Sequence, residues 1–441
     1  STLQLEREAS GFWENRNDPA LKTLSAVQKR KVYGVLPYNW YTKNYGSVLA
    51  NAYFIGKVLY PDRFKDVQTA AKADEIYEFL VGKPVFNQMN AYFNNMAYKA
   101  VLESPMHLAN GQISQDYRRY VSFKIGFMAL AVAGLIMGLA VSLSLGAAGV
   151  PLSVVAKTLL GISVSKRFDM IVWNIRMPQA LAAIVAGAGL SVAGAAMQSI
   201  LRNPLGSPFT LGISQAAAFG AAFSVMILGS GVMQSTNIGS ITISNPYITT
   251  ILAFIFSMIA AGAIILVSRA RGATPEVMVL TGVALGALFT AGTMFLQYLA
   301  DDVQLAAMVF WTFGDVARAS WTELGLLATV TGLLSVYFLF RSWDYNAIDA
   351  GDETAKGLGV RVQRVRLSGM LAASMVTAVI VSFLGIIGFV GLVVPHMGRR
   401  IIGGDNRFLM PATVICGALL LLVSDTVARM MLAPHVLPVS V

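Results

Sequence analysis

"MPQALAAIVAGAGLSVAGAAMQSIL", residues 177–201, is a long apolar run without a charged side chain. As an α-helix it would be about 38 Å long, enough to cross the roughly 30 Å hydrocarbon core of a bilayer. Small residues recur at every fourth position at Gly187, Ser191 and Ala195. This spacing lets helices approach closely in lipid, so it predicts tight helix packing, with a pore-lining role as the second interpretation.

The whole chain shares this character. It has 441 residues, of which 56% are hydrophobic and only 13% charged, and its mean hydropathy is +0.62. Ordinary soluble domains carry about 25% charged residues. The composition therefore predicts an all-α polytopic membrane protein, embedded in lipid. Nine membrane spans are expected, at about 123–146, 177–201, 211–229, 247–268, 277–299, 322–340, 367–386, 387–402 and 408–430.

The charges between the spans predict the orientation, because cationic residues collect in cytoplasmic loops. If the first span enters from the cytoplasm, the inner loops all carry arginine or lysine: 202–210, 269–276, 341–366 and 399–407. The outer loop 230–246 has no charge and 300–321 is mostly acidic, whereas 147–176 dissents with four cations. The net charge of +10 fits this bias better than it fits binding to nucleic acid.

Three regions are expected along the chain: residues 1–100, a linker over 101–122 and the membrane body over 123–441. The first region is polar enough to be soluble. It predicts a short strand and turn in "VYGVLPY" (32–38), followed by helices over 44–59 and 69–82. The first residues lack a basic start and an apolar core, so no signal peptide is expected there. Cys416 is the single cysteine, which excludes a disulfide within the chain.

Four stretches of the body resemble one known family. They are "RMPQALAAIVAGAGLSVAGAAMQSILRNPLGSPFTLGISQAAAFGA" (176–221), "DAGDETAKGLGV" (349–360), "GIIGFVGLVVPHMGRRIIGGDNRFLMPA" (385–412) and "SDTVARMMLAPHVLPVSV" (424–441). Their order and spacing resemble the FecCD/BtuC-like permeases, the membrane subunits of type II ABC importers for iron–siderophore complexes, haem and cobalamin. The resemblance covers about 118–441 and implies an iron complex or a similar metal chelate as the cargo.

The loop 341–366 is where the resemblance implies energy coupling. The chain has no GxxxxGK[ST] phosphate loop, so nucleotide hydrolysis would belong to separate ATPase subunits, two per transporter. In the family this loop seats in a groove of the ATPase. The expected coupling residues are Gly351, Glu353, Ala355, Leu358 and Gly359, with Asp352, Glu353, Lys356 and Arg361 as rim charges. A solvated loop without a partner is the other interpretation.

The outer face implies two further partners. The resemblance places Arg176 and Arg429 at docking positions for an extracytoplasmic binding protein, whereas Gln179 stands where the family has a second arginine. A second permease copy, in a homodimer, would complete the pathway. "LPVSV" (437–441) would lead into a tenth span in the family, so nine of the usual ten spans are expected here. No cofactor and no metal site are expected; His396 is interpreted as a helix-end residue.

Residues 29–86 resemble the C-terminal end of the binding proteins that serve such importers. Less than one lobe of that fold would be present, so this part alone is not expected to bind cargo. The alternative function for the whole chain is a secondary transporter or channel driven by an ion gradient. That alternative requires charged residues in mid-span, and Asp425 and Arg429 are expected to pair with each other near the end of a span.

Overall fold

The computed structural model describes Tyr33 and residues 35–36, 45–92, 97–98, 115–146, 148–162, 164–229, 246–431 and 437–440. The chain divides into two compact units, Ser1–Phe123 and Lys124–Val441. Some sequence predictions fall outside the described residues: those for residues 1–32, for the linker up to 114, for the loop 230–245 and for His435.

The regular elements described in the first unit are all helices. Its elements are α5 (Tyr45–Leu59), the short 3-10 turn η1 (Pro61–Arg63), α6 (Thr69–Val81) and α7 (Phe86–Tyr92). The two predicted helices are confirmed, and α6 ends at Gly82, which has a positive φ of 76°. The predicted strand is wrong for the described part of 32–38, where Tyr33 makes only an isolated bridge. The described part of this unit is therefore α rather than α/β.

A small core holds the first unit together. The hydroxyl groups of Ser47 and Tyr77 lie 2.6 Å apart and join α5 to α6. The ring of Phe54 stacks on Tyr98 with 4.5 Å between the ring centroids. The resemblance of this unit to a binding protein stays a prediction.

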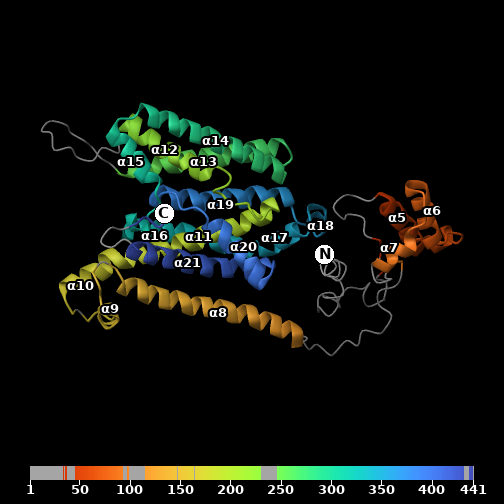
Figure 1. Ribbon diagram of the computed structural model, residues 1–441, viewed down its shortest axis with the longest axis horizontal. Helices are drawn as coiled ribbons and strands as arrows, with labels where there is room; N and C mark the ends of the chain where they lie inside the picture. Colours follow the sequence, from red (N-terminus) through yellow and green to blue (C-terminus); the bar gives the residue numbers. More distant parts are fainter. Residues whose placement is uncertain are drawn as a thin grey trace. The chain divides into compact units, whose positions relative to one another are not determined.

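The second unit is a helical bundle (Figure 1). Its first helix, α8, begins at Gln115, so the end of the predicted linker is already helical. The elements are α8 (Gln115–Ser144), α9 (Leu152–Leu159), α10 (Lys166–Met170), the π-helical turn η2 (Ile171–Arg176), α11 (Met177–Leu201), α12 (Ile213–Leu228), α13 (Pro246–Ala270), α14 (Pro275–Leu299), α15 (Asp302–Thr312), η3 (Val316–Arg318), α16 (Trp321–Phe340), α17 (Ser342–Asp349), α18 (Asp352–Gly357), α19 (Val362–Leu384), α20 (Val390–Ile402) and α21 (Asn406–Met431).

Helix α11 lies at the centre of this bundle. It packs against α16, α19, α20 and α21, and nearly all of its residues are buried (Figure 1). Its alanines and glycines leave a thin helix that can be surrounded on every side. The peripheral helices α8 and α14 instead expose most of their apolar residues, as expected for surfaces that face lipid.

Small residues make the closest helix crossings possible. A Cβ added to Gly187 would lie 2.2 Å from the carbonyl oxygen of Gly417, and one added to Gly194 would lie 1.8 Å from that of Gly391. Ser191 lies between these crossings and donates its hydroxyl to Thr413 O at 2.7 Å. The packing interpretation of this small-residue pattern is therefore confirmed.

The structure corrects the number of spans. Helices occur at all nine predicted places, but only seven of the described helices are long and apolar enough to cross a membrane. Helix α20 has 13 residues and reaches only about 20 Å, while α12 has 16 residues and reaches about 24 Å. Both are shorter than a bilayer core of roughly 30 Å. Hydropathy alone cannot show this, because helix ends depend on local backbone geometry.

Candidate functional site

The segment between α16 and α19 forms two short helices, α17 and α18. They lie with α20 at one end of the bundle, which we call the α17–α18 end (Figure 1). Gly351 and Gly359 flank α18 with φ values of +118° and +85°, a backbone conformation that favours glycine. Within α18, Ala355 is fully buried, whereas Leu358, just after the helix, is 70% exposed. The segment thus combines a residue buried against the bundle, Ala355, with an exposed apolar residue, Leu358.

Asp352 fastens α18 to the bundle. Both of its carboxylate oxygens accept hydrogen bonds from Arg366 in α19, from Nη1 at 3.1 Å and from Nη2 at 2.9 Å. Arg366 is buried and also donates to the carbonyl oxygens of Ile200 and Ala273. The guanidinium of Arg366 therefore joins three parts of the chain: α18, the C-terminal end of α11, and Ala273 in the loop before α14.

Asp349, at the end of α17, is held by a different set of residues. Its Oδ2 accepts hydrogen bonds from Ser199 at 3.0 Å and from Asn406 at 2.8 Å. Arg399 of α20 lies 3.6 Å from the same oxygen and donates to the Ser199 hydroxyl at 3.0 Å. This carboxylate therefore connects α17 to α11, α20 and α21.

The two aspartates form two separate attachments, which we call the Asp349 clamp and the Asp352 clamp. Hydrogen bonds from Arg366 hold the pKa of Asp352 below its ordinary value of 3.8, against the opposing effect of partial burial. The carboxylate is thus charged at neutral pH. Bidentate pairs between arginine and carboxylate also fix orientation, because both groups are planar. Both clamps include α11, through the neighbouring residues Ser199 and Ile200. They differ in that the Asp352 clamp also includes α19, whereas the Asp349 clamp includes α20 and α21.

The five predicted coupling residues all lie in or beside α18. Glu353 is exposed and pairs with Lys356 at 2.8 Å, while Ala355 is the buried member of the five. Their contact with an ATPase stays a prediction. Asp352 was expected to be a rim charge, and this stays a prediction. Its side chain is 32% exposed and also supplies the counter-charge of the buried Arg366.

At the opposite end, which carries α9 and α10, Arg176 is buried. Its guanidinium donates to the carbonyl oxygens of Leu143 at 2.6 Å, Ser144 at 2.8 Å and Ala148. These carbonyls lie at the end of α8 and just after it, where the last turn of a helix lacks partners of its own. Arg176 therefore closes the α8 terminus against the start of α11.

Arg429 is buried at the same end and binds inside the bundle. It lies 3.0 Å from Asp425 and donates to the Ser142 hydroxyl at 2.6 Å. The expected pairing of Asp425 and Arg429 is therefore confirmed. Gln179 donates a hydrogen bond to the other oxygen of Asp425, Oδ1, at 2.9 Å. Docking of a binding protein at Arg176 and Arg429 stays a prediction, and the structure gives both side chains an internal role.

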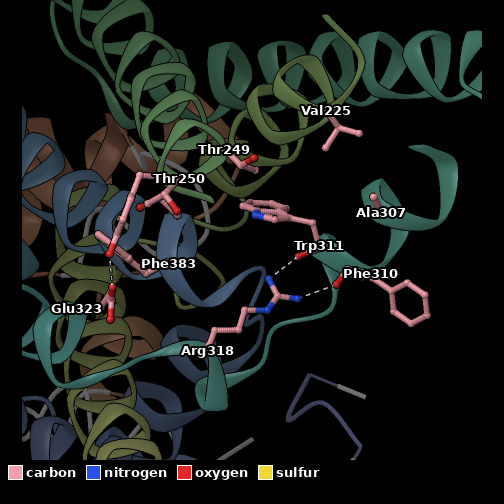
Figure 2. Close-up of a pocket in the computed structure, with 11 residues that line it drawn as sticks. Val225, Thr249, Thr250, Ala307, Phe310, Trp311, Arg318, Glu323 and Phe383 are labelled. Atoms are coloured by element: carbon pink, nitrogen blue, oxygen red, sulfur yellow. Dashed lines mark hydrogen bonds between the residues drawn. The ribbon is translucent and has the colours of Figure 1, made fainter. Parts of the chain in front are cut away.

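A cavity of about 510 Å³ lies between α13, α15 and α19 (Figure 2). Four of its eleven lining residues are aromatic: Tyr247, Phe310, Trp311 and Phe383. Figure 2 shows Arg318 reaching toward the carbonyl oxygens of Trp311 and Phe310, and it also donates to Phe313 O at 2.8 Å. Glu323 accepts a hydrogen bond from Tyr247 at 3.2 Å. The charged groups of this cavity are thus engaged in holding its wall together.

Sequence reasoning missed the residues of the two clamps. Arg366 and Arg399 counted only as loop cations that indicated orientation, and Asp349 had no assigned role. The sequence signal is weak: "DAGD" (349–352) places two carboxylates around a glycine at a helix junction. Nothing local indicates that the two carboxylates face different helices.

Comparison with known proteins gives a consistent result. Residues 134–441 match the FecCD transport family. An ABC transporter permease protein of Methanocaldococcus jannaschii is 51% identical over 329 residues, which cover 75% of this chain and 93% of that protein. The hemin transport system permease protein of Yersinia pestis is 34% identical over 307 residues, with 69% and 89% covered.

A solved structure agrees in fold. An inward-facing conformation of a metal-chelate type ABC transporter matches with a TM-score of 0.61 and 26% sequence identity. The match covers 71% of this chain and 93% of that one.

Proposed function

The chain belongs to the FecCD transport family, and on that premise we propose that it is the permease subunit of an ATP-binding-cassette importer for a metal chelate. Its place is the cell membrane, which its apolar helices cross repeatedly. The cargo is an iron complex or a related chelate such as a siderophore, haem or cobalamin complex. The hemin permease among its relatives supports this class of cargo.

One observation carries the proposal: the two clamps beneath α17 and α18. A separate ATPase pair binds the exposed surface of these helices, with Leu358 at its tip. When nucleotide binding moves this surface, the Asp352 clamp pulls on α19, and the Asp349 clamp pulls on α20 and α21. Binding energy in one subunit thereby favours one state of the pathway in the other.

The remaining partners follow from the same role. A second copy of the chain completes the pathway as a homodimer, and an extracytoplasmic binding protein delivers the chelate at the α9–α10 end. Because Arg176 and Arg429 are engaged internally, we propose that they shape this docking surface by fixing α8, α11 and α21 beneath it.

A gradient-driven transporter is the weaker alternative. It needs a carboxylate within the membrane that can bind and release an ion. Asp425 is 2% exposed, its Oδ1 accepts a hydrogen bond from Gln179, and its Oδ2 lies 3.0 Å from Nε of Arg429. The neighbouring guanidinium already supplies the counter-charge that a transported cation would have to replace.

The test is reconstitution of the chain in liposomes with its cognate ATPase and binding protein. We expect uptake of radiolabelled ferric chelate that requires ATP and persists when the ion gradients are collapsed. Leu358→Asp should abolish binding of the ATPase. The control is Leu205→Asp, which changes another exposed leucine, in the loop between α11 and α12 near the α17–α18 end, and should leave binding intact. Uptake without the ATPase would contradict the proposal.

A further inference from the structure

The chain is not helical between α19 and α20. Helix α19 ends at Leu384, residues 385–389 are irregular, and α20 begins at Val390. A Cβ added to Gly391, the second residue of α20, would lie 2.7 Å from the carbonyl oxygen of Leu190 in α11. Leu190 is about 20 Å from the start of α11 and about 16 Å from its end. The irregular segment therefore ends in the middle of the bundle.

Phe389 ends this segment with a strained turn. Its φ is +62° and its ψ is −35°, and the backbone N–H of Val390 donates to the carbonyl oxygen of Gly388 at 2.7 Å. The three residues form a γ-turn with a positive φ at its centre, which is the rare and strained form. Glycine would adopt this conformation without strain, whereas a bulky side chain does not. Such strain indicates a role for the side chain itself.

The ring of Phe389 projects away from the packed core. Phe389 is 71% exposed, whereas Ile387 and Val390 on either side of it are 5% and 6% exposed. Val393 and Met397 follow at intervals of four residues and are 37% and 53% exposed. Residues four apart lie on one face of a helix, so Phe389 begins an exposed apolar stripe along α20.

This face of α20 has features of a surface that borders water. His396 is exposed beside Met397, about two helical turns after Phe389. Ionisable side chains within a membrane nearly always face the bundle interior or a water-filled cavity. Irregular backbone at membrane depth is likewise tolerated only where protein covers it or where it lines such a cavity. We therefore infer that the exposed side of residues 385–389 lines the transport pathway.

A cavity of about 260 Å³ lies beside the irregular segment. Phe209 and Ile386 both line it, and a Cβ added to Gly388 would lie 3.5 Å from the ring of Phe209. The lining surface of this cavity is mainly apolar. A narrow apolar constriction in a membrane pathway excludes water and hydrated ions by dewetting.

We propose that the ring of Phe389 is a hydrophobic seal that closes the pathway to small ions while the permease is at rest. The inference rests on the proposed function, because a pathway wide enough for a chelate needs a barrier against ion leakage. An ion that enters an apolar constriction loses its hydration without gaining a counter-charge. Arg399 of α20 belongs to the Asp349 clamp, so movement of α17 displaces the helix that carries the seal.

Passive ion exchange tests the seal in liposomes that contain the chain alone. Phe389→Gly removes the ring, so entrapped radiolabelled rubidium should exchange with external potassium about tenfold faster than with the unsubstituted protein. A tenfold change in rate corresponds to a barrier lowered by about 1.4 kcal/mol. Phe340→Ala removes another ring, which is 82% exposed at the end of α16, and should leave the exchange rate unchanged.

Thermal unfolding distinguishes a seal from a residue that only packs. Because glycine suits the positive φ, Phe389→Gly should have a Tm equal to or above that of the unsubstituted protein although it leaks. Phe389→Ala keeps the strain, so it should leak equally but unfold at a lower Tm than Phe389→Gly. A lowered Tm in Phe389→Gly without faster exchange would assign the ring to packing and overturn the proposal.

Cysteine labelling tests whether this position meets water. Cys416 is the single native cysteine, so Cys416→Ala gives a cysteine-free background. In it, Phe389→Cys should react with a water-soluble methanethiosulfonate reagent. Leu130→Cys is the matched control, because Leu130 is 72% exposed but lies on the lipid-facing α8 and should stay unmodified. Absence of reaction at both positions would place Phe389 away from the pathway.

These measurements need neither ATP nor an ATPase, so they are independent of the test of the importer role. Absence of ATP-driven uptake in the unsubstituted protein would refute that role. An unchanged rate of ion exchange in Phe389→Gly would refute only the seal.

Discussion

The two ends of the second unit both depend on buried arginines, but they use them differently. At the α17–α18 end, Arg366 binds a carboxylate that belongs to a short helix bounded by two glycines. At the α9–α10 end, Arg176 binds only carbonyl groups at the terminus of a long helix. The first contact joins an element that can move as a unit, whereas the second completes a fixed helix end. Under the proposed function, Arg366 transmits movement at one end, whereas Arg176 immobilises a helix terminus at the other.

Removing the guanidinium of Arg366 should have the largest effect on transport, and it tests the difference between the two ends most directly. Arg366→Ala removes the donor to two backbone carbonyls and the bidentate partner of Asp352, which keeps only Arg202 at 3.9 Å. Because the Asp352 side chain is 32% exposed, we expect a cost of about 3 kcal/mol, the lower end for breaking a buried ion pair. We expect ATP hydrolysis that no longer drives chelate uptake. The ratio of chelate imported to ATP hydrolysed measures this. Arg364→Ala, an exposed neighbour in α19, is the control, and an unchanged ratio in Arg366→Ala would refute transmission through this clamp.

A change midway between the ends should affect both alike. Gly194→Ala would place a methyl group 1.8 Å from Gly391 O and push α20 away from α11, at a cost of about 3 kcal/mol. Thermal unfolding in detergent should show a much lower Tm, while any protein that folds keeps a normal uptake ratio. Gly325→Ala in α16 has open space around it and should leave the Tm unchanged. Equal Tm values for the two variants would contradict the close crossing.

Arg176→Ala should weaken the fold without uncoupling transport. It leaves three carbonyl groups without their donor, and we expect a loss of about 2 kcal/mol in the free energy of unfolding. Uptake per ATP should remain normal, in contrast to Arg366→Ala. Arg167→Ala, an exposed cation in α10, should alter neither quantity. A lowered uptake ratio in Arg176→Ala would show that this end transmits as well.

The smallest expected effect is a dependence on pH. Because Arg366 lowers the pKa of Asp352, the folded state gains stability that is complete above the ordinary value of 3.8 and is lost as the pH falls through the lower folded pKa. The Tm difference between the unsubstituted protein and Asp352→Asn should thus be constant from pH 8 to about pH 5 and shrink below about pH 4. Glu353→Gln should show no comparable difference. A Tm difference that grows as the pH falls would contradict a lowered pKa of Asp352 in the folded state.

The sequence by itself determined the membrane class, the places of the nine apolar helices and the tight packing around Gly187 and Ser191. Hydrophobic runs and small-residue spacing are local patterns, so they can be read without knowing which helices meet. Even the loop that carries the proposed coupling function was identified on its own residues and their resemblance to a family.

Only the tertiary structure decided which residues far apart in the sequence pair, whereas the pairing of Asp425 with Arg429, one helical turn apart, was expected from the sequence. Arg366 binds Asp352 across 14 positions of the chain and Ile200 across 166, and Arg429 binds Ser142 across 287. A local sequence pattern cannot predict contacts between residues so far apart in the sequence, because each pair forms only when separate helices pack together. The same holds for the short reach of α20. A sequence specifies where helices form through local periodicity, but burial in the assembled bundle determines which polar groups find partners.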